Sequence, residues 1–214
     1  GAMSGAITTQ DLNFCVAVGD LAMSGALDAA ASGSVAVGKS ALADLTSGGS
    51  NTAIGFEAGT NVTTGGLNTF VGYLSGHGLD GSAPLTGAYN TCVGEESGYL
   101  LQGAAHSNTC IGQGAGDVIT TGTTNTLVGR GADPSSATGV NQTVIGSTAT
   151  GQQNNSVTLG NASVTDVFMG SDSGALVHTS AIAFPATQVA SGGANALDDY
   201  EEGDWTGAFS DDST

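Results

Sequence analysis

A short pattern of polar and aliphatic positions recurs along the chain and ends each time in glycine. It reads polar, Val or Thr, any residue, usually Val or Ile, then Gly, with Ala or Ser three positions later. Most steps between the glycines are 17 to 19 residues. This self-similarity predicts a repeat architecture. Aligned in this way, the ten copies end at Gly19, Gly38, Gly55, Gly72, Gly94, Gly112, Gly129, Gly146, Gly160 and Gly170.

The period and composition of the repeat favour strands. A period near 17 is too short for a two-helix repeat, and Gly and Thr stand where a helix needs Leu, Glu or Lys. We predict an all-β chain, a parallel β-roll or solenoid of about ten short rungs with little or no helix. The glycines suit corners, where positive φ or close backbone approach is needed, and the small residue three later would pack inside such a corner.

Three regions are predicted from the extent of the repeat. Residues 1–10 are interpreted as the scar of a cleaved expression tag followed by a lead-in. Residues 11–174 form the β-roll domain. Residues 175–214 are predicted to be a connector with an acidic, partly disordered tail.

Strand alternation assigns the two sides of each rung. The residues one and three before each glycine are mostly Val, Ile or Thr, and we expect them to fill the interior. The residue between them would then face outward, yet it is mostly apolar as well. A strand that is apolar on both sides must be covered on both. We therefore expect a homotrimer, intertwined or side by side, with an axis lined by Phe70, Cys92, Cys110, Leu127, Val144 and Phe168.

Charge excludes two classes of partner. The 214 residues include only 2 Lys plus Arg against 19 Asp plus Glu, which gives a formal net charge of −17. Nucleic acids and anionic membrane surfaces require a basic footprint that two cations cannot supply. No apolar run approaches the roughly 20 residues of a membrane span. We expect neither nucleic-acid binding nor membrane insertion.

Residues that could act in catalysis or bind a metal are scattered along the repeat. Glu95 and Glu96 are adjacent and face opposite ways in an extended chain, which makes them a poor pair for glycoside hydrolysis. Glu57 and Asp117 could each approach other carboxylates across rungs. The histidines form no His-x-His clamp. Calcium binding by the acidic tail is an alternative interpretation, although the tail lacks EF-hand spacing. We expect no catalytic residue, no metal and no cofactor.

Two columns have alternative interpretations. Cys92 and Cys110 occupy the same position in consecutive rungs. Apolar packing of the two side chains is the favoured interpretation, and a disulfide between them is geometrically possible. The column of Asn residues favours a ladder of side-chain hydrogen bonds over a row of sugar-binding groups. Its members are Asn51, Asn68, Asn90, Asn108 and Asn125.

The largest departure from the period is the 22-residue step between Gly72 and Gly94. Insertions in solenoids emerge as loops on one face, often the binding face. We therefore predict a receptor-contact loop that includes His77, Leu79, Asp80 and Pro84.

The repeat resembles that of two families. Residues 51–59 (NTAIGFEAG) and 125–129 (NTLVG) look like the left-handed β-roll heads of trimeric bacterial adhesins, and still more like repeats of bacteriophage tail fibres. Residues 184–190 (FPATQVA) and 197–206 (LDDYEEGDWT) are similar to a connector in phage tail proteins. The resemblance implies a homotrimeric, non-enzymatic attachment protein of the virion tail.

The expected function is a stiff trimeric spacer or a host-receptor-binding element, in contact with other tail fibre segments and with a host surface glycan or protein. One alternative is the head of a bacterial surface adhesin. A polysaccharide depolymerase lacks a convergent acidic pair. An ice-binding solenoid needs an outward Thr column, whereas the Thr column here is predicted to face inward.

Overall fold

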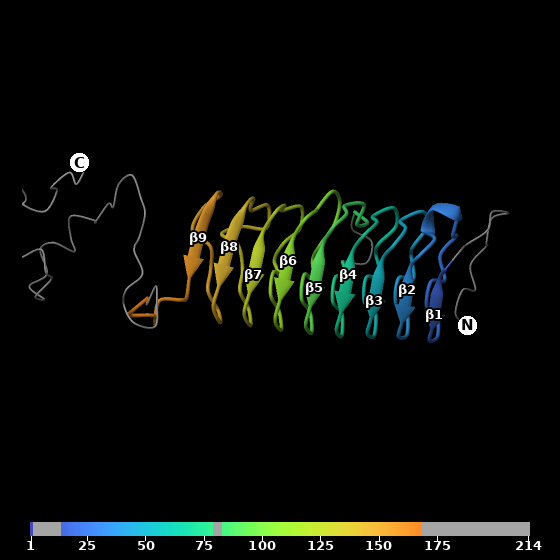
Figure 1. Cartoon of the computed structure of the whole chain (residues 1–214), viewed down its shortest axis with the longest axis horizontal. Coiled ribbons are helices and arrows are strands. Elements are labelled where there is room, and N and C mark those ends of the chain that lie inside the picture. The colour runs from blue at the N-terminus through green and yellow to red at the C-terminus, as the bar shows by residue number, and fades with distance from the viewer. Residues whose placement is uncertain (2–13, 79–82, 168–214) are drawn as a thin grey trace, which may run out of the picture. The chain divides into compact units, whose positions relative to one another are not determined.

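The computed structural model describes residues 1, 14–78 and 83–167, and these form a parallel β-solenoid (Figure 1). Each strand pairs with the next strand in the sequence, so one sheet runs in the order β1 to β9. The strands are β1 (Val16–Val18), β2 (Val35–Val37), β3 (Thr52–Ile54), β4 (Thr69–Val71), β5 (Thr91–Val93), β6 (Thr109–Ile111), β7 (Thr126–Val128), β8 (Gln142–Ile145) and β9 (Ser156–Leu159).

The predicted fold class is confirmed. Nine strands give about eight turns of solenoid, and isolated parallel bridges such as Val62 with Leu85 connect successive turns away from the main sheet. Within the described residues the helical content is one 3₁₀ turn, η1 (Ala29–Ala31). Asp166 and Val167, which begin the tenth copy of the repeat, form no strand, and the rest of that copy and the predicted tail lie outside the described residues.

The register places equivalent repeat positions directly beside one another. Thr91 pairs with Thr109, Cys92 with Cys110 and Val93 with Ile111, and every neighbouring pair of strands follows the same rule. Because each turn repeats the last, every position of the repeat becomes a column along the solenoid.

The repeat glycines occupy the corner at the end of each strand. Gly129 has a φ of +137°, and a Cβ built on it would lie 2.5 Å from the carbonyl oxygen of Gly146 in the next turn. This close approach explains why the position is glycine in all nine rungs. The small residue three positions later is buried in the first eight rungs, as predicted, from Ala22 to Ala149.

The predicted assignment of the two strand faces is wrong. The middle residue of each strand points into the solenoid, and the residues on either side of it point outward. The alternation of side chains along a strand is consistent with this arrangement. The polar residue that opens the motif lies two positions before the middle residue and therefore shares its face. Asn51 and Ala53 are both buried, for example, whereas Ile54 is exposed.

This reversal corrects the predicted trimer axis. The side chains of Phe70, Cys92, Cys110, Leu127 and Val144 are 0% exposed in the core of a single chain, where they have no surface to offer a second copy. Phe168 lies outside the described residues. The middle residues of β2 to β8 belong to the buried hydrophobic core of the single chain.

The Asn column forms the predicted hydrogen-bonded ladder. Asn108 Nδ2 donates to Asn90 Oδ1 at 3.0 Å and to the Gly122 carbonyl at 2.8 Å. Asn108 Oδ1 accepts from the backbone N–H of Asn125 at 3.1 Å and from its Nδ2 at 3.0 Å. These amides are fully buried, so their role is to satisfy buried backbone groups rather than to bind sugar from solvent.

Candidate functional site

The outward side of the sheet is an apolar surface made of two columns, which we call the sheet face. The aliphatic column is substantially exposed, with Ile54 at 42% and Ile145 at 44%. A Thr column runs beside it and is partly exposed. From β3 to β8 the sheet face consists of Thr52, Ile54, Thr69, Val71, Thr91, Val93, Thr109, Ile111, Thr126, Val128, Thr143 and Ile145.

The sheet face is uniform and uncharged. None of the nine strands contains a charged residue, although the chain carries a net charge of −17. Its side chains from β3 to β8 are all β-branched, so each has few χ1 rotamers and the surface is stiff. An exposed, contiguous apolar surface of this kind marks an interaction site.

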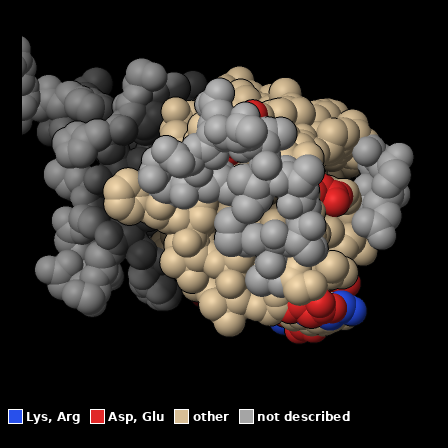
Figure 2. All heavy atoms as spheres, turned by 90° about the vertical axis from the view of Figure 1, so that its right-hand side faces the viewer, with Lys and Arg blue, Asp and Glu red and all other residues tan. Residues whose placement is uncertain are grey.

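A second exposed feature follows the corner glycines. The residues after the first eight corner glycines form a column that we call the corner ridge, and all eight are exposed, whereas Asn161 after Gly160 is half-buried. They are Asp20, Lys39, Phe56, Tyr73, Glu95, Gln113, Arg130 and Ser147. Both basic residues of the chain lie in this column. Figure 2, in which the β1 end faces the viewer, shows basic and acidic side chains together at one corner.

The corner ridge contains a stack of three side chains. The Lys39 ammonium lies 5.4 Å from the centroid of the Phe56 ring, and the Phe56 and Tyr73 rings are stacked with centroids 5.4 Å apart. The stack leaves apolar surface in solvent, because Phe56 is 38% and Tyr73 49% exposed.

The predicted receptor loop is described only in part. Leu79 and Asp80 lie outside the described residues, and Pro84 is exposed. His77 is buried: its ring stacks on Tyr99 with centroids 5.3 Å apart, and its Nε2 lies 3.4 Å from Glu57 Oε2. The His77 Nδ1 atom faces the carbonyl oxygen of Gly78. His77 therefore anchors the base of the insertion instead of contacting solvent.

Of the two carboxylates considered for glycoside hydrolysis, Asp117 approaches another carboxylate across rungs. Glu57 lies against His77, whereas Asp117 interacts with Asp133 of the next turn. Burial raises the pKa of Asp133 to about 6, the negative charge of Asp117 adds to this effect, and the backbone N–H groups of Gly116 and Val118 oppose it. Burial also raises the pKa of Asp117. Asp133 Oδ1 is buried without a hydrogen-bond partner.

We expect Asp133→Asn to stabilise the chain at pH 7. The ordinary pKa of 3.8 applies to the unfolded chain, so between pH 3.8 and about 6 the folded state binds more protons. Stability therefore falls as pH rises through this window, and the penalty is complete above it. After allowance for solvent screening of a half-buried group, the gain is about 1–2 kcal/mol at pH 7.

The measurement is urea unfolding at pH 4 and pH 7. The difference between Asp133→Asn and the parent chain should be small at pH 4 and larger at pH 7. Glu95→Gln, on the exposed corner ridge, controls for loss of one negative charge. A gain that does not depend on pH would contradict the assignment to Asp133.

The two buried cysteines form no disulfide in this structure. Cys92 and Cys110 are paired residues of β5 and β6, and both are fully buried. A hydrogen bond with Cys92, together with burial, raises the pKa of the Cys110 thiol well above its usual value. Both side chains pack as small apolar groups in the core.

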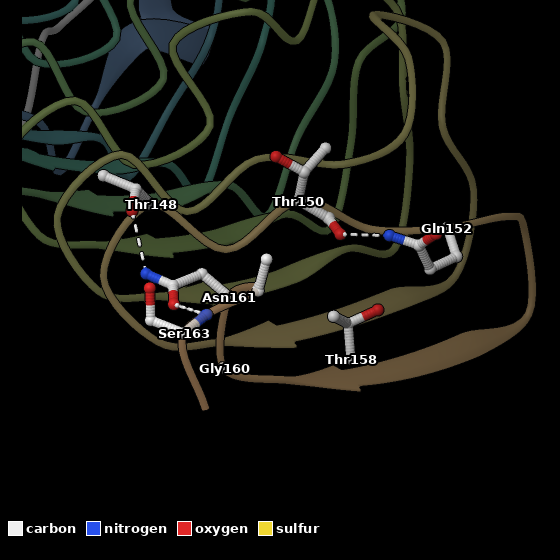
Figure 3. Close-up of a pocket in the computed structure, with 8 residues that line it drawn as sticks. Thr148, Thr150, Gln152, Thr158, Gly160, Asn161 and Ser163 are labelled. Atoms are coloured by element: carbon white, nitrogen blue, oxygen red, sulfur yellow. Dashed lines mark hydrogen bonds between the residues drawn. The ribbon is translucent and has the colours of Figure 1, made fainter. Parts of the chain in front are cut away.

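A cavity of about 570 Å³ lies at the β9 end of the solenoid (Figure 3). The step from Gly146 to Gly160 is 14 residues, and the interior residue of β9 is Thr158 in place of an aliphatic one. Asn161 Nδ2 donates to Thr148 Oγ1 at 3.1 Å, so part of the polar lining is satisfied internally. The lining comprises Thr148, Thr150, Gln152, Thr158, Gly160, Asn161, Ala162 and Ser163.

Comparison with known proteins adds no assignment: no family model, curated protein or solved structure significantly matches the chain. Within residues 14–78 and 83–167, no helix has the length and apolar character to cross a membrane. In the same part of the chain, no three His, Cys, Asp or Glu side chains gather in a set that suits a metal ion.

Proposed function

We propose that the chain is a structural and adhesive segment of an attachment fibre, in which three copies form a stiff spacer or a receptor-binding element. The observation that carries this proposal is the sheet face, which is apolar, stiff, uncharged and exposed in a single chain. The resemblance of the repeat to phage tail fibres supports placement in a virion tail, among other tail fibre segments. A bacterial surface adhesin is the alternative setting.

The distribution of charge favours self-association through the sheet face. Chains of net charge −17 repel one another unless the contact surface excludes the charged groups. The strands carry none, and the nearest charges lie on the corner ridge. Burying Val71, Val93 and Ile111 around a three-fold axis would remove their exposed surface from water, at about 25 cal/mol per Å². Closed symmetry also stops assembly at a defined number of copies.

Size-exclusion chromatography with light scattering tests the assembly. We expect a species with three times the mass of one chain at micromolar concentration. Binding of the labelled chain to bacterial cells tests the attachment role. A stable monomer would contradict the trimer, and failure to bind any of a panel of cells would leave only the spacer role.

A second candidate is ice binding by a single chain, because the Thr column faces outward beside the aliphatic column. The predicted inward orientation of the Thr column counted against this function, but these threonines lie on the outward side of the sheet. Stacked hydroxyl and methyl groups recur about every 4.8 Å on a stiff, flat surface, and such a grid can order water. The two candidates use the same surface, so a monomer that shows thermal hysteresis would favour ice binding and exclude the trimer.

A further inference from the structure

The corner ridge differs from the other columns of the repeat in its chemical variety. The corner glycine, the small buried residue and the Asn each recur with little change because packing or hydrogen bonding requires them. The ridge instead changes from Lys39 to Phe56, Tyr73 and Glu95 in four successive rungs. In a solenoid, a column without a structural requirement is where recognition can vary without disturbing the core.

The backbone of the ridge is already engaged. The carbonyl of Lys39 accepts from the N–H of Glu57, that of Phe56 from Leu74, and that of Tyr73 from Glu96. A peptide strand that docks by main-chain hydrogen bonds would find these acceptors occupied. Recognition at the ridge must therefore come from side chains.

The side chains available suit a sugar. Phe56 and Tyr73 offer partly exposed aromatic surface for C–H groups, with a phenolic hydroxyl at the edge. Lys39 and Glu95 border them and supply a donor and an acceptor for hydroxyl groups. Successive ridge residues are about 4.8 Å apart, close to the length of one sugar unit in an extended polymer.

We propose that the corner ridge from Lys39 to Glu95 binds a neutral, linear polysaccharide aligned with the solenoid. The net charge of −17 disfavours polyanionic glycans, which the chain would repel. Lys39 is the only cation in this part of the ridge, and Arg130 lies two rungs beyond Glu95. The site deepens the proposed attachment function and rests on it for its biological meaning.

The test is binding of the parent chain and two double variants to an array of bacterial surface glycans that includes neutral and acidic polymers. Phe56→Ala with Tyr73→Ala removes the aromatic part of the ridge. Leu67→Ala with Tyr89→Ala is the matched control, because these residues lie in neighbouring rungs, off the ridge, and are 51% and 62% exposed. Light scattering and thermal unfolding verify that both variants keep the parent assembly and fold.

We expect the parent to bind at least one neutral linear glycan, the ridge variant to bind it about tenfold more weakly or not at all, and the control to bind as the parent does. The proposal is overturned if no neutral glycan binds, if only acidic glycans bind, or if both variants bind equally. Cell binding distinguishes failure of the ridge site from failure of the attachment function. If the ridge variant still attaches to cells, the ridge is not the attachment site, but the attachment function stands. If the parent chain itself does not attach to cells, the attachment function is contradicted and only the spacer role remains.

Discussion

Leu127→Asp is expected to unfold the central turns of the solenoid within each chain. Leu127 is fully buried between its strand partners Cys110 and Val144, so the substitution removes apolar packing and places a carboxylate in the core. The two effects together cost about 5 kcal/mol or more, a large part of the stability of an ordinary domain. Loss of the β-sheet circular dichroism signal, or a much lower melting temperature, is the expected readout.

Val128→Asp is the matched control, because it makes the same kind of change one residue along, on the sheet face. The carboxylate would remain in solvent in a single chain, so each solenoid should stay folded while the trimer dissociates. Light scattering separates the two outcomes. A Leu127→Asp chain that stayed folded but became monomeric would restore the interior column to the trimer axis and contradict the strand faces described above.

Much of the fold was predictable from the sequence because the repeat positions have separate physical requirements. The corner glycines identify the turns, since a Cβ at Gly129 would clash with the next rung. The spacing of these glycines then gives the register, because an in-register parallel sheet repeats each position once per turn. The Asn ladder was predictable for the same reason, as identical amides stack only when they align.

The direction of the strand faces was predicted wrongly, because the two regular columns of Val, Ile and Thr were expected to fill the interior. The interior column varies from Ala36 to Phe70, and residues four positions after the glycine, in the same turn or a neighbouring one, fill the difference. Gly59, in the rung of Ala53, leaves room for Phe70 and Leu42 of the adjacent turns. Leu42 accompanies Ala36, whereas Gly76 lies against the Phe70 ring. Close packing fixes the volume that neighbouring turns fill together rather than the size of one residue. The parity shared by Asn51 and Ala53 was the available signal.

The corner ridge was also missed, although its members are readable from the sequence as the residues after each glycine. Their significance depends on the alignment of successive rungs, which brings Lys39, Phe56 and Tyr73 into one stack. The contact between His77 and Glu57 was not predicted, because the two residues occupy different positions of the repeat, five and two residues after their corner glycines.

Asn108→Ala is expected to destabilise the chain by about 3–5 kcal/mol. The substitution leaves the Gly122 carbonyl and the backbone N–H of Asn125 buried without their side-chain partner. It also removes both hydrogen bonds that link the Asn108 amide with the amides of the neighbouring rungs. Each buried polar group left unsatisfied costs about 1–3 kcal/mol, and the losses are not fully additive.

Asn141→Ala provides the comparison, because its Nδ2 makes a 2.8 Å hydrogen bond with Asn155 Oδ1 on the exposed side of a rung. Water can replace that partner, but Asn141 has a φ of +52°, a left-handed conformation that Ala tolerates less well than Asn, so the expected cost is about 1 kcal/mol. Urea unfolding of both variants at one chain concentration measures the difference, because assembly makes stability concentration-dependent. If the two variants lost equal stability, the ladder would contribute no more than a surface hydrogen bond. The sheet and the corner glycines alone would then hold the rungs in register, and the strict recurrence of Asn from β3 to β7 would lose its physical explanation.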